Sequence, residues 1–326
     1  MNAPLPLVSI GMPVYNGERH LREALDSLMA QDYPSLEIVI SDNASEDATA
    51  SICREYQARD PRIRYHRNAA NLGAARNFNQ VFGLCSGEFF MWAACDNIVA
   101  PSFVRQCARL LLQYPEASVC HAQCQFISSE GRPFGPAHVN YQNTDSKSTA
   151  RWRRVLADRD YPEWYTAVYG LMRAQCMRRT GLMRTVWGAD QIFIAEISLY
   201  GTIVQVPEQL WWLRQHDEVT SSDEIYQSVM RKLDPARSKM KRRWTQFGIH
   251  RECARIARNA PWPLPVRLQL WAGAIVSYFS TGGWLNDLEE LHAVGAVLQR
   301  VRDLLKPQAL PGKLSVKERD EPQQSA

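Results

Sequence analysis

Residues 89–97 read Phe89-Phe90-Met91-Trp92-Ala93-Ala94-Cys95-Asp96-Asn97, an apolar run that ends abruptly in a carboxylate and an amide. Such a short, bulky run predicts a buried strand rather than a helix. Pro101 begins a helical pattern, so Asp96 and Asn97 are expected on the turn that leaves the strand. Ligands of open α/β sheets bind in the crevice outside the carboxyl ends of the strands. An aspartate there is well placed to hold a divalent metal on a diphosphate, although Asp and Asn are also common in ordinary turns.

Strand and helix patterns alternate before this segment. Apolar runs at residues 8–13, 37–41 and 63–66 predict strands, and a helical pattern follows each of them, the first from Asn16 or Gly17 onward. This alternation predicts a Rossmann-like α/β fold with a mostly parallel sheet flanked by helices. The sequence has no GxGxxG and no GxxxxGK[ST] motif, so it has neither the dinucleotide fingerprint nor the P-loop.

Composition narrows the class of protein. The 326 residues include 38 Lys and Arg against 34 Asp and Glu, and this mild net charge of +4 argues against a general nucleic-acid binder. The amino terminus lacks the pattern of a signal peptide, and the longest mostly apolar stretch is shorter than the roughly 20 residues of a membrane-spanning helix. The eight cysteines form no CxxC pair, and because the sequence shows no export signal we expect them to be reduced in a cytoplasmic protein. A zinc site at Cys120, His121 and Cys124 is disfavoured, because a strand would place His121 on the opposite face.

Polar residues collect at the exits of three predicted strands, at Tyr15, Asp42 and Asp96. Core packing does not explain this convergence. Since a parallel sheet brings the carboxyl ends of its strands together, these side chains are expected to line one crevice for a nucleotide.

Three motifs then give a family resemblance. They are Pro13-Val14-Tyr15-Asn16-Gly17-Glu18, Ser41-Asp42-Asn43-Ala44-Ser45-Glu46-Asp47 and Asn71-Leu72-Gly73-Ala74-Ala75-Arg76-Asn77. In order and spacing they resemble the opening of family 2 glycosyltransferases, whose GT-A fold joins a nucleotide-binding sheet to an acceptor-binding half. The resemblance implies a GT-A domain at residues 1–222, with a nucleotide half at 6–100 and an acceptor half at 101–222. A helical C-terminal extension at 223–305 and a disordered tail at 306–326 are expected to follow.

The resemblance also implies roles at the nucleotide. Tyr15 matches a residue near the donor base, with Pro13 shaping its loop, and Asp42 matches a carboxylate that accepts a hydrogen bond from the base. Arg76 matches an arginine on the nucleotide side. Taken singly, Tyr15 would be a loop aromatic that covers the core, and Asp42 a helix cap. The full set of implied nucleotide-binding residues is Pro13, Tyr15, Glu18, Asp42, Arg76, Cys95 and Asp96.

The metal motif departs from the family pattern. Family members carry Asp-x-Asp at this strand exit, often followed by another Asp, whereas this chain has Ala94, Cys95, Asp96 and Asn97. The resemblance implies Mn²⁺ or Mg²⁺ on Asp96, with Asn97 as a neutral oxygen ligand. It also implies a third ligand at His216, although imidazole is not the preferred ligand of these metals. The reduced motif leaves weaker metal binding, or a loss of activity, open.

Asp190 is the candidate catalytic residue. It begins a helical pattern after Trp187-Gly188-Ala189, where the resemblance implies a general base for inverting transfer. Ala189 replaces the acid that accompanies this base in the family. The simpler interpretation is a helix cap, since the dipole stabilises an anion at this end. Arg214, just before His216, is expected either to support the diphosphate or to pair with a carboxylate.

Two other regions suggest accessory roles. Residues 128–149 are rich in loop-forming residues and are a candidate lid on the acceptor side. Residues 231–243 are strongly basic and precede an aromatic-rich helical region at 262–284. This region is compatible with an appendage packed on the catalytic domain, with a homodimer face, or with a peripheral dock on the inner face of the membrane.

The sequence therefore predicts an inverting glycosyltransferase with a divalent metal. It would move a sugar from a nucleotide-diphosphate donor, expected to be a UDP-sugar, to a hydroxyl of a saccharide or lipid-linked saccharide in surface polysaccharide or glycolipid synthesis. One alternative is a nucleotide-binding scaffold of the same fold that has lost its chemistry. A sugar nucleotidyltransferase is less favoured, because residues 13–18 lack the expected Gly-rich loop with Arg or Lys.

Overall fold

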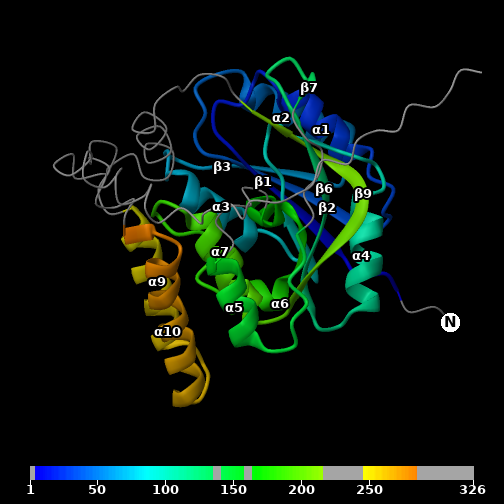
Figure 1. Cartoon of the computed structure of the whole chain (residues 1–326). Coiled ribbons are helices and arrows are strands. Elements are labelled where there is room, and N and C mark those ends of the chain that lie inside the picture. The colour runs from blue at the N-terminus through cyan, green and yellow to red at the C-terminus, as the bar shows by residue number, and fades with distance from the viewer. Residues whose placement is uncertain (1–3, 135–140, 158–163, 216–244, 285–326) are drawn as a thin grey trace, which may run out of the picture.

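The computed structural model describes residues 4–134, 141–157, 164–215 and 245–284, which fold around one curled sheet of nine strands (Figure 1). The strands are β1 (Val8–Val14), β2 (Leu36–Asp42), β3 (Ile63–Arg67), β4 (Phe89–Trp92), β5 (Ile98–Val99), β6 (Ala117–Ile127), β7 (Pro133–Phe134), β8 (Leu171–Arg173) and β9 (Thr202–Arg214). The helices are α1 (Leu21–Met29), α2 (Thr49–Arg59), α3 (Ala74–Gly83), α4 (Phe103–Gln113), α5 (Ser148–Ala157), α6 (Ala174–Met177), α7 (Ala189–Ser198), α9 (Thr245–Asn259) and α10 (Leu264–Ser280), with a 3-10 helix η1 (Trp164–Tyr169).

The order of strands in the sheet is β3-β2-β1-β4-β8-β6-β9-β5, and β7 pairs with β6. The long pairings are parallel: β1 with β2 and β4, β2 with β3, and β6 with β9. The antiparallel pairings join only two residue pairs each. The prediction of a mostly parallel sheet flanked by helices is confirmed. Because β1 lies between β2 and β4, the exits of all three strands fall at one edge of the sheet.

The first helix begins later than its pattern indicates. α1 starts at Leu21 rather than at Asn16 or Gly17. Asn16 has a left-handed backbone, with φ of 49°, and its N–H donates to the Ser45 hydroxyl in the neighbouring loop. Asn tolerates this conformation better than most residues, so residues 15–17 form a loop at the exit of β1 instead of a helical turn.

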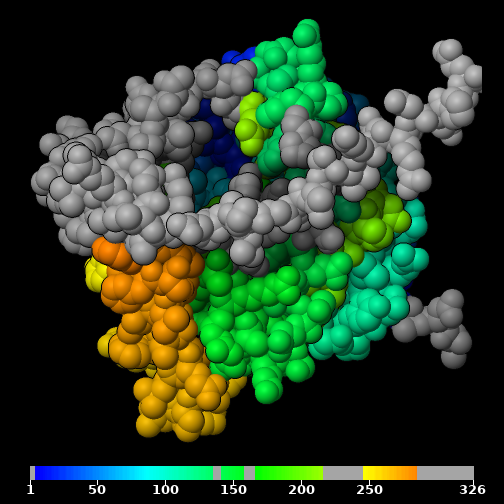
Figure 2. Space-filling model, viewed as in Figure 1, coloured from blue at the N-terminus to red at the C-terminus, as the bar shows by residue number. Residues whose placement is uncertain are grey.

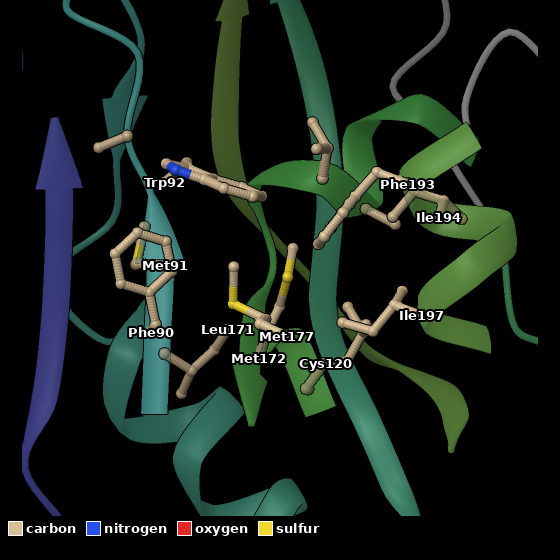
Figure 3. Packing of buried hydrophobic residues seen from close by; sticks show 14 of the residues in the cluster. Phe90, Met91, Trp92, Cys120, Leu171, Met172, Met177, Phe193, Ile194 and Ile197 are labelled. Atoms are coloured by element: carbon tan, nitrogen blue, oxygen red, sulfur yellow. The ribbon is translucent and has the colours of Figure 1, made fainter. Parts of the chain in front are cut away.

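An aromatic cluster joins the two halves of the sheet (Figure 3). Trp92 at the end of β4 packs edge-to-face against Phe90 and against Phe193 of α7, with ring centroids 5.4 and 5.0 Å apart. The indole N–H of Trp92 donates to the carbonyl of Phe78 at 3.0 Å, which ties α3 to the same cluster. Such aromatic pairs add to the free energy of burial, so β4, α3 and α7 are held in a fixed arrangement.

Two helices near the carboxyl end of the described residues form a hairpin against the sheet-containing part of the molecule, where α9 packs on α7 and α10 on α5 (Figure 1). The indole N–H of Trp152 in α5 donates to the carbonyl of Leu270, and the Ser277 hydroxyl donates to the carbonyl of Leu156. Arg184 pairs with Glu196 of α7 and with Glu252 of α9. Both helices lie within the predicted helical extension, whose predicted limits at 223 and 305 lie outside the described residues, so this division into domains stays a prediction.

The outer face of α10 is apolar and exposed. Its exposed large side chains are Leu264, Leu268, Trp271, Val276 and Phe279. Within the described ranges, none of the helices has both the length and the apolar character needed to cross a membrane. The appendage interpretation agrees with the buried face of α10, whereas a homodimer or a membrane contact at its outer face stays a prediction.

Candidate functional site

A cavity of about 560 Å³ opens at the carboxyl ends of β1, β2 and β4. In Figure 2 the blue amino-terminal part of the chain is seen at the bottom of a hollow in this face. The wall combines the loop after β1, the turn after β4 and the first turns of α3. The cavity thus lies where the sheet topology places a ligand.

The loops after β1 and β2 are locked together at this cavity. Asn16 N–H donates to the Ser45 hydroxyl at 2.9 Å, and Glu46 N–H returns a bond to Asn16 Oδ1 at 2.9 Å. Gly17 N–H donates to the Thr49 hydroxyl at 2.8 Å. These bonds provide acceptors for the backbone N–H groups of Asn16, Gly17 and Glu46. The rim of the cavity is therefore held in shape without a ligand.

Four of the predicted nucleotide-binding residues lie in the wall: Pro13, Tyr15, Cys95 and Asp96. Pro13 is buried near the end of β1, while the Tyr15 ring stands at the rim with 44% of its surface exposed. Cys95 and Asp96 are half-buried on the turn after β4.

Glu18 and Arg76 lie outside this wall. The Glu18 carboxylate accepts the N–H of Ala48 at 2.9 Å and so caps the start of α2. Arg76 is exposed on the first turn of α3. Both residues lie close in sequence to wall residues but do not line the cavity. Their roles at a nucleotide stay predictions, which these positions do not support.

Asp42 lies beneath the cavity rather than in its wall. Its side chain is fully buried, and Oδ2 accepts from the Tyr65 hydroxyl at 2.7 Å and from Arg67 at 3.0 Å. Oδ1 accepts the N–H of Ser45 at 2.8 Å. Burial, together with this carboxylate, raises the pKa of Tyr65 to about 12. Asp42 therefore binds β3 and the loop after β2, which does not support the predicted bond to a base.

Asparagine side chains, and not the Asp42 carboxylate, line the cavity wall near the exit of β2. Asn43, Asn71 and Asn77 line the cavity, and the buried Asn68 joins them from behind. Asn43 Nδ2 donates to Asn71 Oδ1 at 2.8 Å, while Asn68 Nδ2 bridges Asn43 Oδ1 and Asn77 Oδ1. Our interpretation of the sequence missed these amides, although Asn43, Asn71 and Asn77 lie within the quoted motifs and could have been considered.

Asp96 is the predicted metal ligand whose side chain reaches the cavity. Asn97 is buried, and its Oδ1 accepts the backbone N–H of Arg214 at 3.0 Å, which makes it a poorer ligand candidate. His216 lies outside the described residues. No cluster of three or more His, Cys, Asp or Glu occurs in the described part of the chain. A single carboxylate still fits Mg²⁺ or Mn²⁺ chemistry, because such ions take one or two carboxylates and complete their shell with phosphate oxygens and water.

Arg214 fixes the turn that carries Asp96. Its buried guanidinium donates to the carbonyls of Asp96, Ser128 and Ser129 at 2.9, 3.0 and 3.0 Å. It also pairs with Glu23 of α1 at 2.5 Å. Of the two roles expected for Arg214, the structure shows the pairing with a carboxylate. This single side chain joins β9, α1, the turn after β4 and the loop after β6.

A second cavity of about 320 Å³ adjoins the first and shares Ala74 and Phe78 with it. Its wall is largely apolar, including Tyr169 and Met183, and its only carboxylate among the described residues is Asp190. Burial raises the pKa of Asp190 above its ordinary value, against the lowering effect of a hydrogen bond from the N–H of Gln191. A more basic carboxylate at the first turn of α7 is thus placed next to the first cavity.

Residues 9–187, more than half of the chain, match the model of glycosyl transferase family 2. An uncharacterized glycosyltransferase of Haemophilus influenzae is 28% identical over 226 residues, covering 67% of this chain and 68% of that protein. Glycosyltransferase GlyA of Streptococcus pneumoniae is 32% identical over 125 residues, but these cover 38% of this chain and only 18% of GlyA.

Among solved structures, the crystal structure of S. aureus TarS 1-349 in complex with UDP-GlcNAc superposes with a TM-score of 0.58. The identity is 18%, and the match covers 84% of this chain and 73% of that one, so it establishes the fold alone. That fold is the GT-A fold predicted from the motifs. Because the family match covers more than half of the chain, including all of the residues that line the first cavity, the chain belongs to glycosyl transferase family 2.

Proposed function

We propose that the protein transfers a sugar from a nucleotide-diphosphate donor, a UDP-sugar, to a hydroxyl of a saccharide or lipid-linked saccharide. The observation that carries this proposal is the pair of adjoining cavities, with Asp96 in one and the half-buried, more basic Asp190 in the other. The complex of TarS with UDP-GlcNAc, on the same fold, supports the choice of donor. Assembly of a surface polysaccharide or glycolipid is the expected setting.

The first cavity suits a nucleoside diphosphate by its length. The amides after β2 and the carboxylate after β4 are separated by β1, and two strand spacings amount to about 10 Å. The base would lie beside Tyr15 and the asparagines, and the diphosphate would point toward Asp96. Asp96 is the residue that would hold Mn²⁺ or Mg²⁺, which when bound would offset negative charge on the leaving diphosphate.

Asp190 is assigned as the general base of a single inverting displacement. As the acceptor oxygen forms its bond to the anomeric carbon, the bond from that carbon to the diphosphate breaks and the leaving group keeps the electron pair. The hydroxyl proton passes to Asp190, whose raised pKa makes it a better proton acceptor than an exposed aspartate. The apolar wall around it limits access of water, which would otherwise hydrolyse the donor.

The rival function is a scaffold that binds a nucleotide without turning it over. Ala94 and Ala189, where the resemblance leads us to expect acids, favour it. Calorimetric titration with UDP and GDP, each with and without Mn²⁺, tests the first cavity, and release of free UDP from UDP-sugars tests the chemistry. We expect metal-dependent UDP binding that is lost in Asp96→Ala, and turnover that is lost in Asp190→Asn while UDP binding persists. Binding without any turnover would support the scaffold, and absence of all nucleotide binding would refute the proposal.

A further inference from the structure

We propose that the hairpin of α9 and α10 docks on an anionic lipid bilayer, with the outer face of α10 buried at the boundary between headgroups and acyl chains. The surface stands apart from both cavities, since no described residue of α9 or α10 lines either wall. The inference therefore does not rest on the proposed function. Of the two occupants that the sequence left open for the outer face of this region, a membrane is selected over a second copy of the chain.

The residues of α10 are distributed in the reverse of the usual order. A surface helix normally turns its large apolar side chains inward and its polar ones outward. The buried face of α10 instead includes three small residues, Gly273, Ala274 and Ser277. The large apolar side chains of its outer face are between 46% and 61% exposed, and they are Leu264, Leu268, Trp271, Val276 and Phe279.

These five side chains form one apolar ridge. With 3.6 residues per turn, they fall on a single side of α10 and follow it from its first turn to its last. The hairpin stands at the edge of the described chain, so the ridge lies on the outside of the molecule (Figures 1 and 2). Single exposed apolar residues are normal, but a contiguous group of this kind marks a contact with a partner or a membrane.

One edge of the apolar ridge is bordered by α9. The ring of Phe247 packs on Tyr278, and Tyr278 packs on Phe279, with ring centroids 6.0 and 5.2 Å apart. The exposed Arg251 and Arg258 follow Phe247 at intervals of four and seven residues, so they share its face of α9. Two arginines thus run beside the ridge.

The far end and the opposite edge of the ridge are basic too. Arg267 of α10 donates to the carbonyl of Arg258 at 2.9 Å, which brings these two side chains to the same end of the hairpin. On the other edge, a Cβ on Gly273 would lie 3.0 Å from Arg153 Cγ. The stem of the exposed Arg153 therefore packs against α10, and its guanidinium extends the positive rim to α5.

The charge of this surface is strongly one-sided. α5 carries three arginines and no acidic residue, α9 three arginines and one glutamate, and α10 one arginine and no acidic residue. The single acid, Glu252, already pairs with Arg184 and Arg255. An apolar face with a basic rim matches the two layers of a bilayer surface, because the ridge reaches the acyl boundary while the arginines meet lipid phosphates.

The same charges disfavour a second copy of the chain as the occupant. A two-fold contact would set one ridge against another and bring the rims of both copies together. Arg153, Arg251 and Arg258 would then face their own counterparts without a carboxylate on these helices to offset them. Anionic headgroups remove this repulsion, so the bilayer is the better match.

The first test measures vesicle binding of the unaltered full chain. Sedimentation compares vesicles of phosphatidylcholine alone with vesicles that contain about 30% phosphatidylglycerol, a strongly anionic surface. We expect binding to the anionic vesicles to be about tenfold or more tighter, and to weaken as salt screens the arginines. No binding to the anionic vesicles, or equal binding to both kinds, would overturn the inference.

The second test assigns the contact to the hairpin. One variant combines Leu268→Gln with Val276→Gln, and another combines Arg251→Gln with Arg258→Gln. Each should weaken binding to the anionic vesicles about tenfold or more, since each basic residue near such a surface contributes about fivefold and a buried apolar side chain a similar amount.

The matched control combines Leu112→Gln with Arg109→Gln, two exposed positions of α4, and should bind like the unaltered chain. All of these side chains are exposed, so the variants should stay folded, which urea unfolding checks. Unchanged binding in either hairpin variant would overturn the inference. A dimer in sedimentation equilibrium that Leu268→Gln with Val276→Gln dissociates, together with no vesicle binding, would overturn it in favour of a second copy.

Discussion

Replacing Arg214 with methionine should destabilise the protein and weaken its metal-dependent nucleotide binding together. Methionine keeps much of the buried stem but removes the donors to three carbonyls, those of Asp96, Ser128 and Ser129. Hydrogen bonds from charged groups contribute roughly 1.5–3 kcal/mol each, and water replaces part of this at half-buried carbonyls. We therefore expect a loss of about 3 kcal/mol in the free energy of unfolding, most of it from the carbonyls.

The assay is urea unfolding of Arg214→Met and of a matched control, Glu23→Gln. The control removes only the ion pair, and because the Glu23 side chain is 51% exposed it should cost less than about 0.5 kcal/mol. UDP titration with and without Mn²⁺ on both variants measures the second effect, since the freed turn no longer holds Asp96 in place. Equal stability of Arg214→Met and the control, with an unchanged response to Mn²⁺, would refute the reasoning.

Three further predictions concern single residues. Asp190→Asn should abolish sugar transfer yet stabilise the fold at neutral pH. Because the pKa of Asp190 is raised in the folded state, the free energy of unfolding of the wild type falls as pH rises from the ordinary aspartate pKa through the raised one. Melting temperatures measured against pH should show this fall in the wild type and not in the variant. Gly17→Ala should lower the free energy of unfolding by about 1–3 kcal/mol and weaken UDP binding, since the added Cβ would lie 2.7 Å from a Val14 methyl. The control Gly83→Ala, whose Cβ would have nothing within 4 Å, should stabilise α3 by roughly 0.5 kcal/mol in the same urea assay. Tyr65→Phe should remove the stability loss that the wild type shows between pH 10 and about 12, because the folded state keeps the phenol proton that the unfolded chain releases; an identical pH profile would contradict this.

The position of the crevice could be predicted from the sequence, because strand periodicity and the alternation of strands and helices are visible along the chain. Strand exits in a parallel sheet meet at one edge, so Pro13, Tyr15 and Asp96 could be placed there from periodicity and topology. Asp42 and Asn43 show the limit of this reasoning. Successive side chains at a strand end point in different directions, so adjacent residues differ in which one is buried and which one lines the cavity. A motif gives the position of a residue in the chain but not the direction of its side chain.

Long-range contacts account for the remaining differences. Asn97 is held by Arg214, 117 positions away in the sequence, because β5 pairs with β9. Local chemistry could suggest two roles for Arg214, but only the folded chain shows Glu23 beside it. The raised pKa of Asp190 likewise depends on burial by elements that are distant in sequence. His216 lies outside the described residues, so its role as a metal ligand stays a prediction.

The wall shared by the two cavities has a consequence for steady-state kinetics. Ala74 and Phe78, one turn apart on α3, face both cavities, so bound donor and acceptor would lie in contact across them. In the proposed single displacement both substrates must be present at once, so initial-rate plots at several acceptor concentrations should give intersecting rather than parallel lines. A bulkier sugar on the donor would raise the acceptor KM by crowding the same two side chains. Under the proposed function, selectivity for one substrate is coupled to the size of the other.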